Sequence, residues 1–235
     1  MTTISIIGSG NMATAIGSRA AAHGHTVELL GRNAAKAQAL AEQIGNAATV
    51  GTPGETPQGD IVFVAVRYDD AVAAVAGYGE SLAGKILVDI SNPFNAEASG
   101  LVTSAGSSAA QEIAAAAPES AHVVKALNTI FGHVLAKGTP LDAFIAGDSA
   151  EAKATVAAFL ESLELRTLDA GGLQAASILE SASLLLMGWH ETVPASTSPW
   201  VPRSSAHWPP QRPNRRLARH NPGASFAATA SWVLG

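Results

Sequence analysis

Short apolar segments rich in β-branched residues alternate with longer alanine-rich segments along most of the chain. Such alternation is typical of strand–helix–strand units that build a parallel sheet, and continuous apolar runs are expected of strands covered on both faces. The pattern predicts strands at Ile4–Ile7, Thr26–Leu30, Ile61–Val66, Ile86–Ile90, His122–Ala126, Ala143–Ala146 and Leu165–Leu168.

Helices are expected between these strands, where small and apolar residues recur at helical spacing. Asn33 and Ser149 each precede such a segment and are suited to cap its free amides. A further helix after the last strand places Leu173, Leu179 and Leu186 on one face, which predicts packing against the sheet or a second subunit. The predicted helices are Met12–Ala22, Ala34–Ile44, Asp70–Val75, Ala109–Ala117, Ala150–Leu163 and one within residues 169–192.

These elements predict an α/β fold of the Rossmann type, with a doubly wound, mainly parallel sheet and helices on both faces. We expect the sheet domain to cover residues 1–168 and a packing or dimerisation helix to cover residues 169–192. From Val193 onward there are seven of the 12 prolines, three of the four tryptophans and no acidic residue. Proline cannot continue a helix or an inner strand, so an irregular tail is expected over residues 193–235. The abrupt change after Thr192 also suggests a shifted reading frame as a hypothesis.

Composition and charge exclude several kinds of function. The chain has no cysteine, so disulfides, thiolate metal sites and thiol nucleophiles are excluded, and no metal site is expected. Its formal net charge is −5 and every acidic residue lies at or before Glu191, which argues against nucleic acid as a partner. The apolar stretch Leu173–Trp189 is broken by Gln174 and Glu180 and is too short for a membrane span. Because the first strand begins at Ile4, no leader is expected and a cytoplasmic location is predicted.

A glycine loop joins the first strand to the first helix, and it reads Gly8-Ser9-Gly10-Asn11-Met12-Ala13. In a dinucleotide fold the first glycine permits a tight turn, the second lets a pyrophosphate approach the backbone, and a small third residue lets the helix pack on the strand. The helix N-terminus adds free amides and the positive end of its dipole. Turn glycines alone would give the same letters, but strand, loop, helix and second strand follow at the expected spacing. The six residues are therefore the expected dinucleotide-binding loop.

The end of the second strand distinguishes NAD from NADP. NAD enzymes usually carry a carboxylate there for the ribose 2′-hydroxyl, whereas this chain has Gly31, Arg32 and Asn33. The guanidinium of Arg32 suits a phosphate, and Lys36, one helical turn later, adds a second cation. Glu28 is a rival carboxylate, but it lies inside the strand. The pattern favours NADP, with ordinary surface cations as the alternative interpretation.

Two later segments carry a resemblance to a known family. They read Asp89-Ile90-Ser91-Asn92-Pro93-Phe94 and Val124-Lys125-Ala126-Leu127-Asn128-Thr129. With the glycine loop and the Gly31-Arg32-Asn33 tip, they make residues 1–190 resemble the F420-dependent NADP reductases and related dinucleotide-binding enzymes. The resemblance implies a homodimeric Rossmann protein that passes a hydride between NADP(H) and the deazaflavin coenzyme F420 or a flavin-like acceptor. It also implies a crevice bordered by the loops after the fourth and fifth strands.

Further site residues are expected at the ends of the strands. Ala65, Val66 and Arg67 close the third predicted strand and, with Asn92 and Pro93, complete the expected cofactor-binding set. Hydride transfer between two rings needs alignment and exclusion of water more than it needs an acid or base. This agrees with the lack of a triad or carboxylate pair in the sequence.

Three residues are candidates for contact with the reacting rings. Asn128 and Thr129 could hold ring carbonyls or the nicotinamide amide, or could be ordinary turn residues. His133 follows closely enough to enter the pocket, as an acid or base or as a structural group. Lys125 lies within an apolar strand, where the favoured interpretation is a salt bridge at the edge of the sheet.

Two other functions stay open. The letters Gly10-Asn11-Met12-Ala13 also resemble the pyrroline-5-carboxylate reductases, although too few residues follow Leu168 for the long helical dimerisation domain of those enzymes. A non-catalytic NADPH-binding module that senses redox state is equally compatible with the lack of acid–base groups. Near His190 the chain departs from the F420-dependent family, whose members continue into apolar segments that close the deazaflavin pocket.

Overall fold

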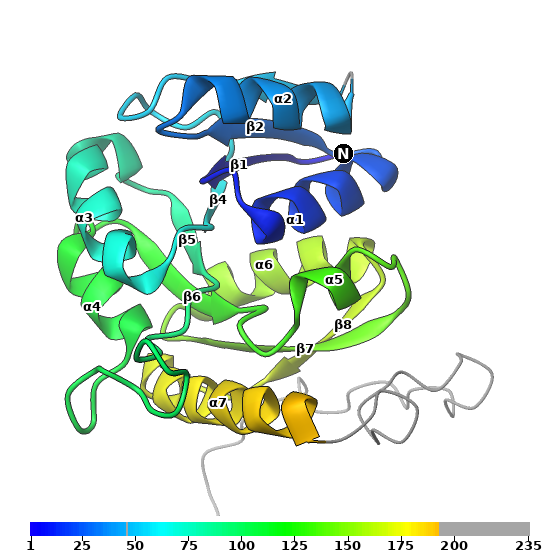
Figure 1. Cartoon of the computed structure of the whole chain (residues 1–235). Helices are drawn as coiled ribbons and strands as arrows, with labels where there is room; N and C mark the ends of the chain where they lie inside the picture. The colour runs from blue at the N-terminus through cyan, green and yellow to red at the C-terminus, as the bar shows by residue number, and fades with distance from the viewer. Residues whose placement is uncertain (46, 193–235) are drawn as a thin grey trace, which may run out of the picture. The chain divides into compact units, whose positions relative to one another are not determined.

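The computed structural model describes residues 1–45 and 47–192. In this part of the chain one sheet is formed in the order β3-β2-β1-β4-β5-β6-β7-β8 (Figure 1). Neighbouring strands are parallel except β6 and β7, which pair antiparallel. The strands are β1 (Thr3–Ile7), β2 (Thr26–Leu30), β3 (Ala48–Val50), β4 (Ile61–Val64), β5 (Ile86–Asp89), β6 (His122–Ala126), β7 (Leu141–Gly147) and β8 (Leu165–Asp169).

Helices cover both faces of the sheet (Figure 1). In the described residues they enclose two large hydrophobic cores, beside a small third cluster of Ala146, Ala175 and Leu179. In β4, Ile61 and Phe63 belong to one core and Val62 and Val64 to the other, as the two-residue period of a strand requires. The first core is covered by α1 (Asn11–Ala22), α2 (Ala34–Ile44), α5 (Gly132–Leu135) and α6 (Ala150–Ser162). The second is covered by α3 (Tyr68–Tyr78), α4 (Ala109–Ala116), the 3₁₀ turns η1 (Gly79–Leu82) and η2 (Leu173–Ala175), and the start of α7 (Ala176–Thr192). The predicted doubly wound α/β fold is confirmed.

The direction of winding reverses at β1. The chain passes from β1 to β2 and β3 on one side and then crosses to β4 on the other side of β1. In the parallel register, Ile7 is level with both Leu30 and Val64, so three strands end at the same height. Ligands of open α/β sheets bind in the crevice outside the carboxyl ends of the strands at such a switch point. The fold therefore positions a ligand site beside the loop after β1.

The observed helix caps agree with those predicted from the sequence, and a few element bounds differ. The side chains of Asn33 and Ser149 cap α2 and α6 by accepting hydrogen bonds from the amides of Lys36 and Ala152. Strand β4 ends at Val64 instead of the predicted Val66, and α3 begins earlier and ends later than Asp70–Val75. The three-residue β3 and four-residue α5 were not predicted, because segments this short carry no readable period.

Two other expectations concern the tail and the presence of membrane spans. The predicted irregular tail, residues 193–235, lies outside the described residues. Among the helices that the structure does describe, none combines the length and the hydropathy needed to cross a bilayer.

Candidate cofactor and acceptor site

The glycine loop between β1 and α1 presents an open cradle. Gly8 has φ +128°, and a Cβ there would overlap the carbonyl oxygen of Ala65 in the loop after β4. At Gly10, in contrast, a Cβ would meet no atom within 4 Å, and no side chain caps the N-terminus of α1. Ala13 is fully buried against the strand. The loop thus packs tightly against the end of β4 at Gly8, and it leaves open space beside the backbone amides at Gly10. This arrangement fits a pyrophosphate.

The tip of β2 packs directly against this loop. A Cβ added at the buried Gly31 would lie 3.2 Å from the Cβ of Ala37 and 3.4 Å from the hydroxyl of Ser9. A carboxylate at this position would therefore be crowded. The rival carboxylate, Glu28, is 3% exposed and accepts a hydrogen bond of 2.6 Å from the hydroxyl of Ser5, inside the sheet. No acidic side chain thus stands at the tip of β2 itself.

Two arginines beside the crevice each pair with a carboxylate of α3. Arg32 Nη2 lies 2.8 Å from the carboxylate of Asp70, which belongs to the first turn of α3, and Arg67 lies 3.3 Å from Asp69. Both arginine side chains are mostly exposed. Lys36 is also exposed, and no ion pair joins it to a carboxylate in the described part of the chain. Arg32 therefore reaches across the crevice from β2 toward α3. The sequence does not reveal Asp70 as the partner of Arg32, because Asp70 follows β4 and Arg32 follows β2.

A pocket of about 190 Å³ opens beside the start of α1, outside the ends of β5 and β6. Its polar lining comes from two loops and α7, and the remaining lining is apolar. Pro93 is buried and is not among the lining residues; His133 is exposed, is also not among them, and stacks on Phe131 with ring centroids 5.7 Å apart. The lining comprises Met12, Ile90, Asn92, Phe94, Leu127, Asn128, Thr129, Ile130, Phe131, Gly132, Ser183, Leu186 and Met187.

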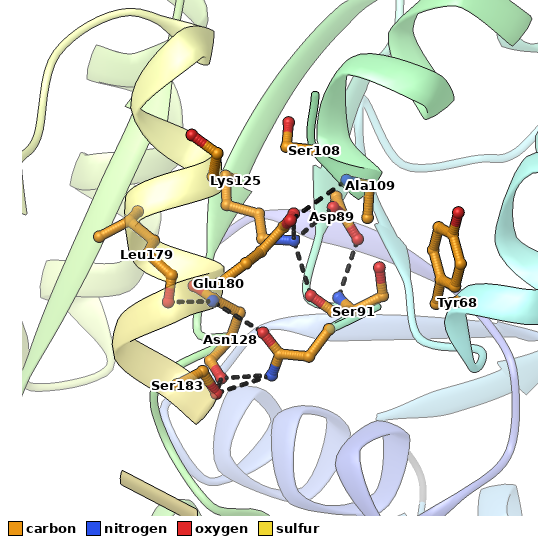
Figure 2. Close-up of polar contacts among 12 residues, drawn as sticks. Tyr68, Asp89, Ser91, Ser108, Ala109, Lys125, Asn128, Leu179, Glu180 and Ser183 are labelled. Atoms are coloured by element: carbon orange, nitrogen blue, oxygen red, sulfur yellow. Dashed lines mark hydrogen bonds and ion pairs between the residues drawn. The ribbon is translucent and has the colours of Figure 1, made fainter. Parts of the chain in front are cut away.

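Asn92, Asn128 and Ser183 are hydrogen-bonded to one another at the pocket wall; Figure 2 labels Asn128 and Ser183. The Asn128 side-chain nitrogen donates to the side-chain oxygen of Asn92 and to the carbonyl of Leu179, at 3.0 Å each. Leu127, just before Asn128, holds the uncommon φ of +58°, a conformation that costs free energy and often occurs at ligand sites. The nitrogen of Asn128 is thus engaged within the protein, so Asn128 organises the wall that Thr129 and Asn92 share.

A buried charged cluster lies behind this wall (Figure 2). Lys125 Nζ is 2.7 Å from Asp89, 2.8 Å from Glu180 and 2.6 Å from the carbonyl of Ser91, and the three charged side chains are fully buried. The expected salt bridge of Lys125 is present, but its expected place at the sheet edge was wrong, because β6 lies between β5 and β7 in the interior of the sheet. Burial raises the pKa of the Glu180 carboxyl above its ordinary value, and the charge of Lys125 offsets this rise only in part.

Asp89, Glu180 and Ser183 were not among the predicted site residues. In the sequence, Glu180 stands out only as a polar interruption of an apolar helix. A signal was nevertheless present: a carboxylate on the buried face of one apolar element and a lysine inside another are each costly to bury alone and are expected to pair.

Comparisons with known proteins agree with this geometry. Residues 3–93 match the family model described as NADP oxidoreductase, coenzyme F420-dependent. Over 191 residues the chain is 31% identical to the metalloreductase STEAP3 of Rattus norvegicus, an overlap of 79% of this chain and 37% of that protein. The chain therefore spans little more than a third of this curated relative.

Solved structures extend the likeness over most of the sheet. One described as an F420-dependent NADP reductase from Arthrobacter sp. FB24 superposes with a TM-score of 0.68 at 27% identity, covering 80% of this chain and 92% of that chain. A protein from Sinorhizobium meliloti superposes with a TM-score of 0.66 at 28% identity, covering 75% and 88%. With its carboxylate-free β2 tip and open glycine loop, the chain is similar to the coenzyme F420-dependent NADP oxidoreductases, whose family model matches residues 3–93.

Proposed function

We propose that this chain moves a hydride between NADP(H) and a planar ring acceptor, either a deazaflavin such as coenzyme F420 or a flavin. The observation that carries the proposal is the open glycine loop and the β2 tip with Arg32 at the switch point, together with an uncharged pocket beside the start of α1. The dinucleotide supplies the hydride when bound. The residues of the chain bind it, orient it and exclude water.

The residues around the crevice fit NADP. Backbone amides from Gly10 to Ala13 would hold the pyrophosphate, since α1 has no side-chain cap and the space above Gly10 is open. Arg32 and Lys36 would hold the 2′-phosphate. The loop from Ala65 to Arg67 leads directly into α3, whose Asp70 contacts Arg32, so this loop lies on the opposite side of the crevice. Binding a phosphate would require Arg32 to exchange its pair with Asp70 for the ligand. An exposed pair of this kind is worth only about 0–1 kcal/mol, so this exchange costs little.

The pocket beside the crevice suits an uncharged ring. Its described lining contains no Asp, Glu, Lys or Arg, and its polar groups are amides and hydroxyls. An apolar lining with a few fixed polar groups is the usual form of a small-molecule site. In this proposal Asn92 and Thr129 meet the polar edge of the ring, and Phe94 and Phe131, which also line the pocket, contact its flat face.

Binding and turnover experiments test the proposal separately. The full-length chain is titrated with NADPH and NADH, followed by the fluorescence of the bound dihydronicotinamide, and then assayed with oxidised F420, FMN, ferric citrate and pyrroline-5-carboxylate. We expect tighter binding of NADPH than NADH, and NADPH-dependent loss of F420 or FMN absorbance. NADPH binding without turnover would support a non-catalytic module, turnover of only pyrroline-5-carboxylate would support an imine reductase, and no NADPH binding would overturn the proposal.

Replacement of Arg32 by Asp tests the 2′-phosphate site. A charge-assisted hydrogen bond is worth about 1.5–3 kcal/mol, so we expect NADPH affinity to fall by about 10- to 150-fold and the preference over NADH to disappear. Fluorescence titration with both nucleotides measures the effect. Arg166→Ala is the control, because it removes a guanidinium paired with Asp142 on neighbouring strands β7 and β8. An unchanged nucleotide preference in Arg32→Asp would contradict this assignment.

A further inference from the structure

Three segments meet at the pocket, and each contributes two polar side chains three positions apart. The segments are the end of β5 with its loop, the end of β6 with its loop, and α7. In each pair the first residue is charged and fully buried, and the second is neutral and lines the pocket. The pairs are Asp89 and Asn92, Lys125 and Asn128, and Glu180 and Ser183. We call the first residues of the pairs the charged layer and the second residues the neutral layer; Figure 2 labels all three charged residues, and Asn128 and Ser183 of the neutral ones.

Lys125 joins all three segments within the charged layer. Its ammonium contacts the carboxylate of Asp89 from β5, the carbonyl of Ser91 from the following loop, and the carboxylate of Glu180 from α7. The other oxygen of Glu180 accepts a hydrogen bond of 3.3 Å from the amide of Ala109, at the start of α4. Buried ion pairs of this kind are weak devices for stability, because desolvation offsets much of their attraction. They do fix one relative position of the elements that carry them.

The neutral layer depends on where α7 lies. Asn92 Nδ2 donates to the carbonyl of Asn128 at 2.8 Å and to the hydroxyl of Ser183 at 2.9 Å, and Ser183 donates to the same carbonyl at 2.8 Å. Ser183 follows Glu180 by three residues, so both lie on the same face of α7. Leu186, one turn further on the same helix, also lines the pocket. A shift of α7 would therefore break the neutral layer and move one wall of the pocket.

We propose that Lys125 and Glu180 are positioning residues for the acceptor pocket: their ion pair sets α7 against β5 and β6 and thereby holds Asn92, Asn128 and Ser183 in place for the polar edge of the acceptor ring. This inference rests on the proposed function for the identity of the acceptor. The charged residues act through the neutral layer and do not line the pocket. Their loss should therefore affect the acceptor and leave the dinucleotide loop, on β1 and α1, unchanged.

The experiment compares Glu180→Gln and Lys125→Met with a matched control. Glu180→Gln keeps the size of the side chain and an oxygen for the Ala109 amide but removes the charge. Lys153→Met is the control, since it removes a lysine paired with Asp169 at 2.9 Å by the end of β8. In full-length protein we expect Glu180→Gln to raise the KM for F420 or FMN about tenfold, the lower end of the effect that outer partners of metal ligands have on their sites, without a change in the Kd of NADPH. Lys153→Met should change neither value.

A second readout needs no acceptor. The side-chain amide signals of Asn92 and Asn128 in ¹H–¹⁵N spectra of the free protein should shift in Glu180→Gln and stay in place in Lys153→Met. If Lys125→Met does not fold, Glu180→Gln carries the test. Equal changes in acceptor KM and NADPH Kd, or amide signals that stay in place, would overturn the inference. If the wild type binds NADPH but reduces no acceptor, the proposed function fails, and the amide signals alone decide the positioning role.

Discussion

Two glycines in one turn are under opposite constraints. Gly8 has a positive φ and faces the carbonyl of Ala65 so closely that no Cβ fits. Gly10 has an extended conformation that any residue adopts, and the space around it is open. The first glycine is therefore required by the fold, while the second is required only if a ligand approaches its backbone.

Alanine at each position separates these two roles. We expect Gly8→Ala to lower the free energy of unfolding by about 2 kcal/mol or more, because the residue is strained and the Cβ collides with backbone. Gly10→Ala should keep wild-type stability and weaken NADPH binding at least about tenfold, which is about 1.4 kcal/mol. Urea unfolding and nucleotide titration measure the two effects. Full NADPH affinity in Gly10→Ala would mean that no pyrophosphate contacts this loop.

Helices α3 and α4 are linked beside the crevice by one phenol. The hydroxyl of Tyr68, the first residue of α3, donates a hydrogen bond of 2.7 Å to the carboxylate of Glu112 on α4. Burial and this hydrogen bond raise the pKa of Tyr68 to about 12. The phenol thus stays protonated well into the alkaline range and holds the start of α3, which directly follows the Ala65-to-Arg67 loop.

The titration of Tyr68 tests this link between helices. In Glu112→Gln the hydrogen bond to a charged acceptor is lost, so the pKa of Tyr68 should fall from about 12 toward the ordinary value of 10.0. The raised pKa contributes stability that is complete below pH 10.0 and is lost as the pH rises toward about 12, and the variant should lack the part of this contribution that comes from Glu112. Ultraviolet absorbance of phenolate reports the titration, with Tyr78→Phe as background because the chain has two tyrosines. A pKa that stays near 12 in Glu112→Gln would assign the shift to burial alone.

The two ends of the sheet are tied together by a buried arginine. Arg19 of α1 is 5% exposed and donates to the carbonyls of Leu163, Leu135 and Thr139 at 2.8, 3.1 and 2.9 Å. These acceptors follow Arg19 by 116 to 144 residues. Burial lowers the pKa of its guanidinium from the ordinary value, although the group stays protonated at neutral pH. One side chain of α1 therefore donates to three carbonyls at or just beyond the ends of α5 and α6.

Loss of this arginine should destabilise the entire fold. Arg19→Met keeps an apolar side chain but leaves the carbonyl of the buried Leu163 without the donor it has here, so we expect unfolding to become easier by about 1–3 kcal/mol. Arg166→Met is the control, because it removes a partly exposed pair that is worth about 0–1 kcal/mol. Urea unfolding followed by circular dichroism gives both values. A loss below about 1 kcal/mol would show that water replaces the guanidinium.

Much of the fold was readable from local patterns. Seven strands, the caps Asn33 and Ser149, and the loop from Gly8 to Ala13 were predicted from residue types a few positions apart. This is possible because turn geometry, capping and strand period depend on neighbouring residues. The elements that were missed, β3 and α5, are too short to show a period.

Contacts between distant segments needed the folded chain. The sequence placed Lys125 in an apolar strand, but only the strand order set that strand in the interior of the sheet, and only the return of α7 brought Glu180 to it across 55 residues. The reach of Arg32 to Asp70 likewise depends on β2 and β4 flanking β1. Local residue types thus determined the glycine loop, the carboxylate-free tip and the strands. Tertiary structure decided which charges meet, because the partner of a buried charge is chosen by where the chain folds back.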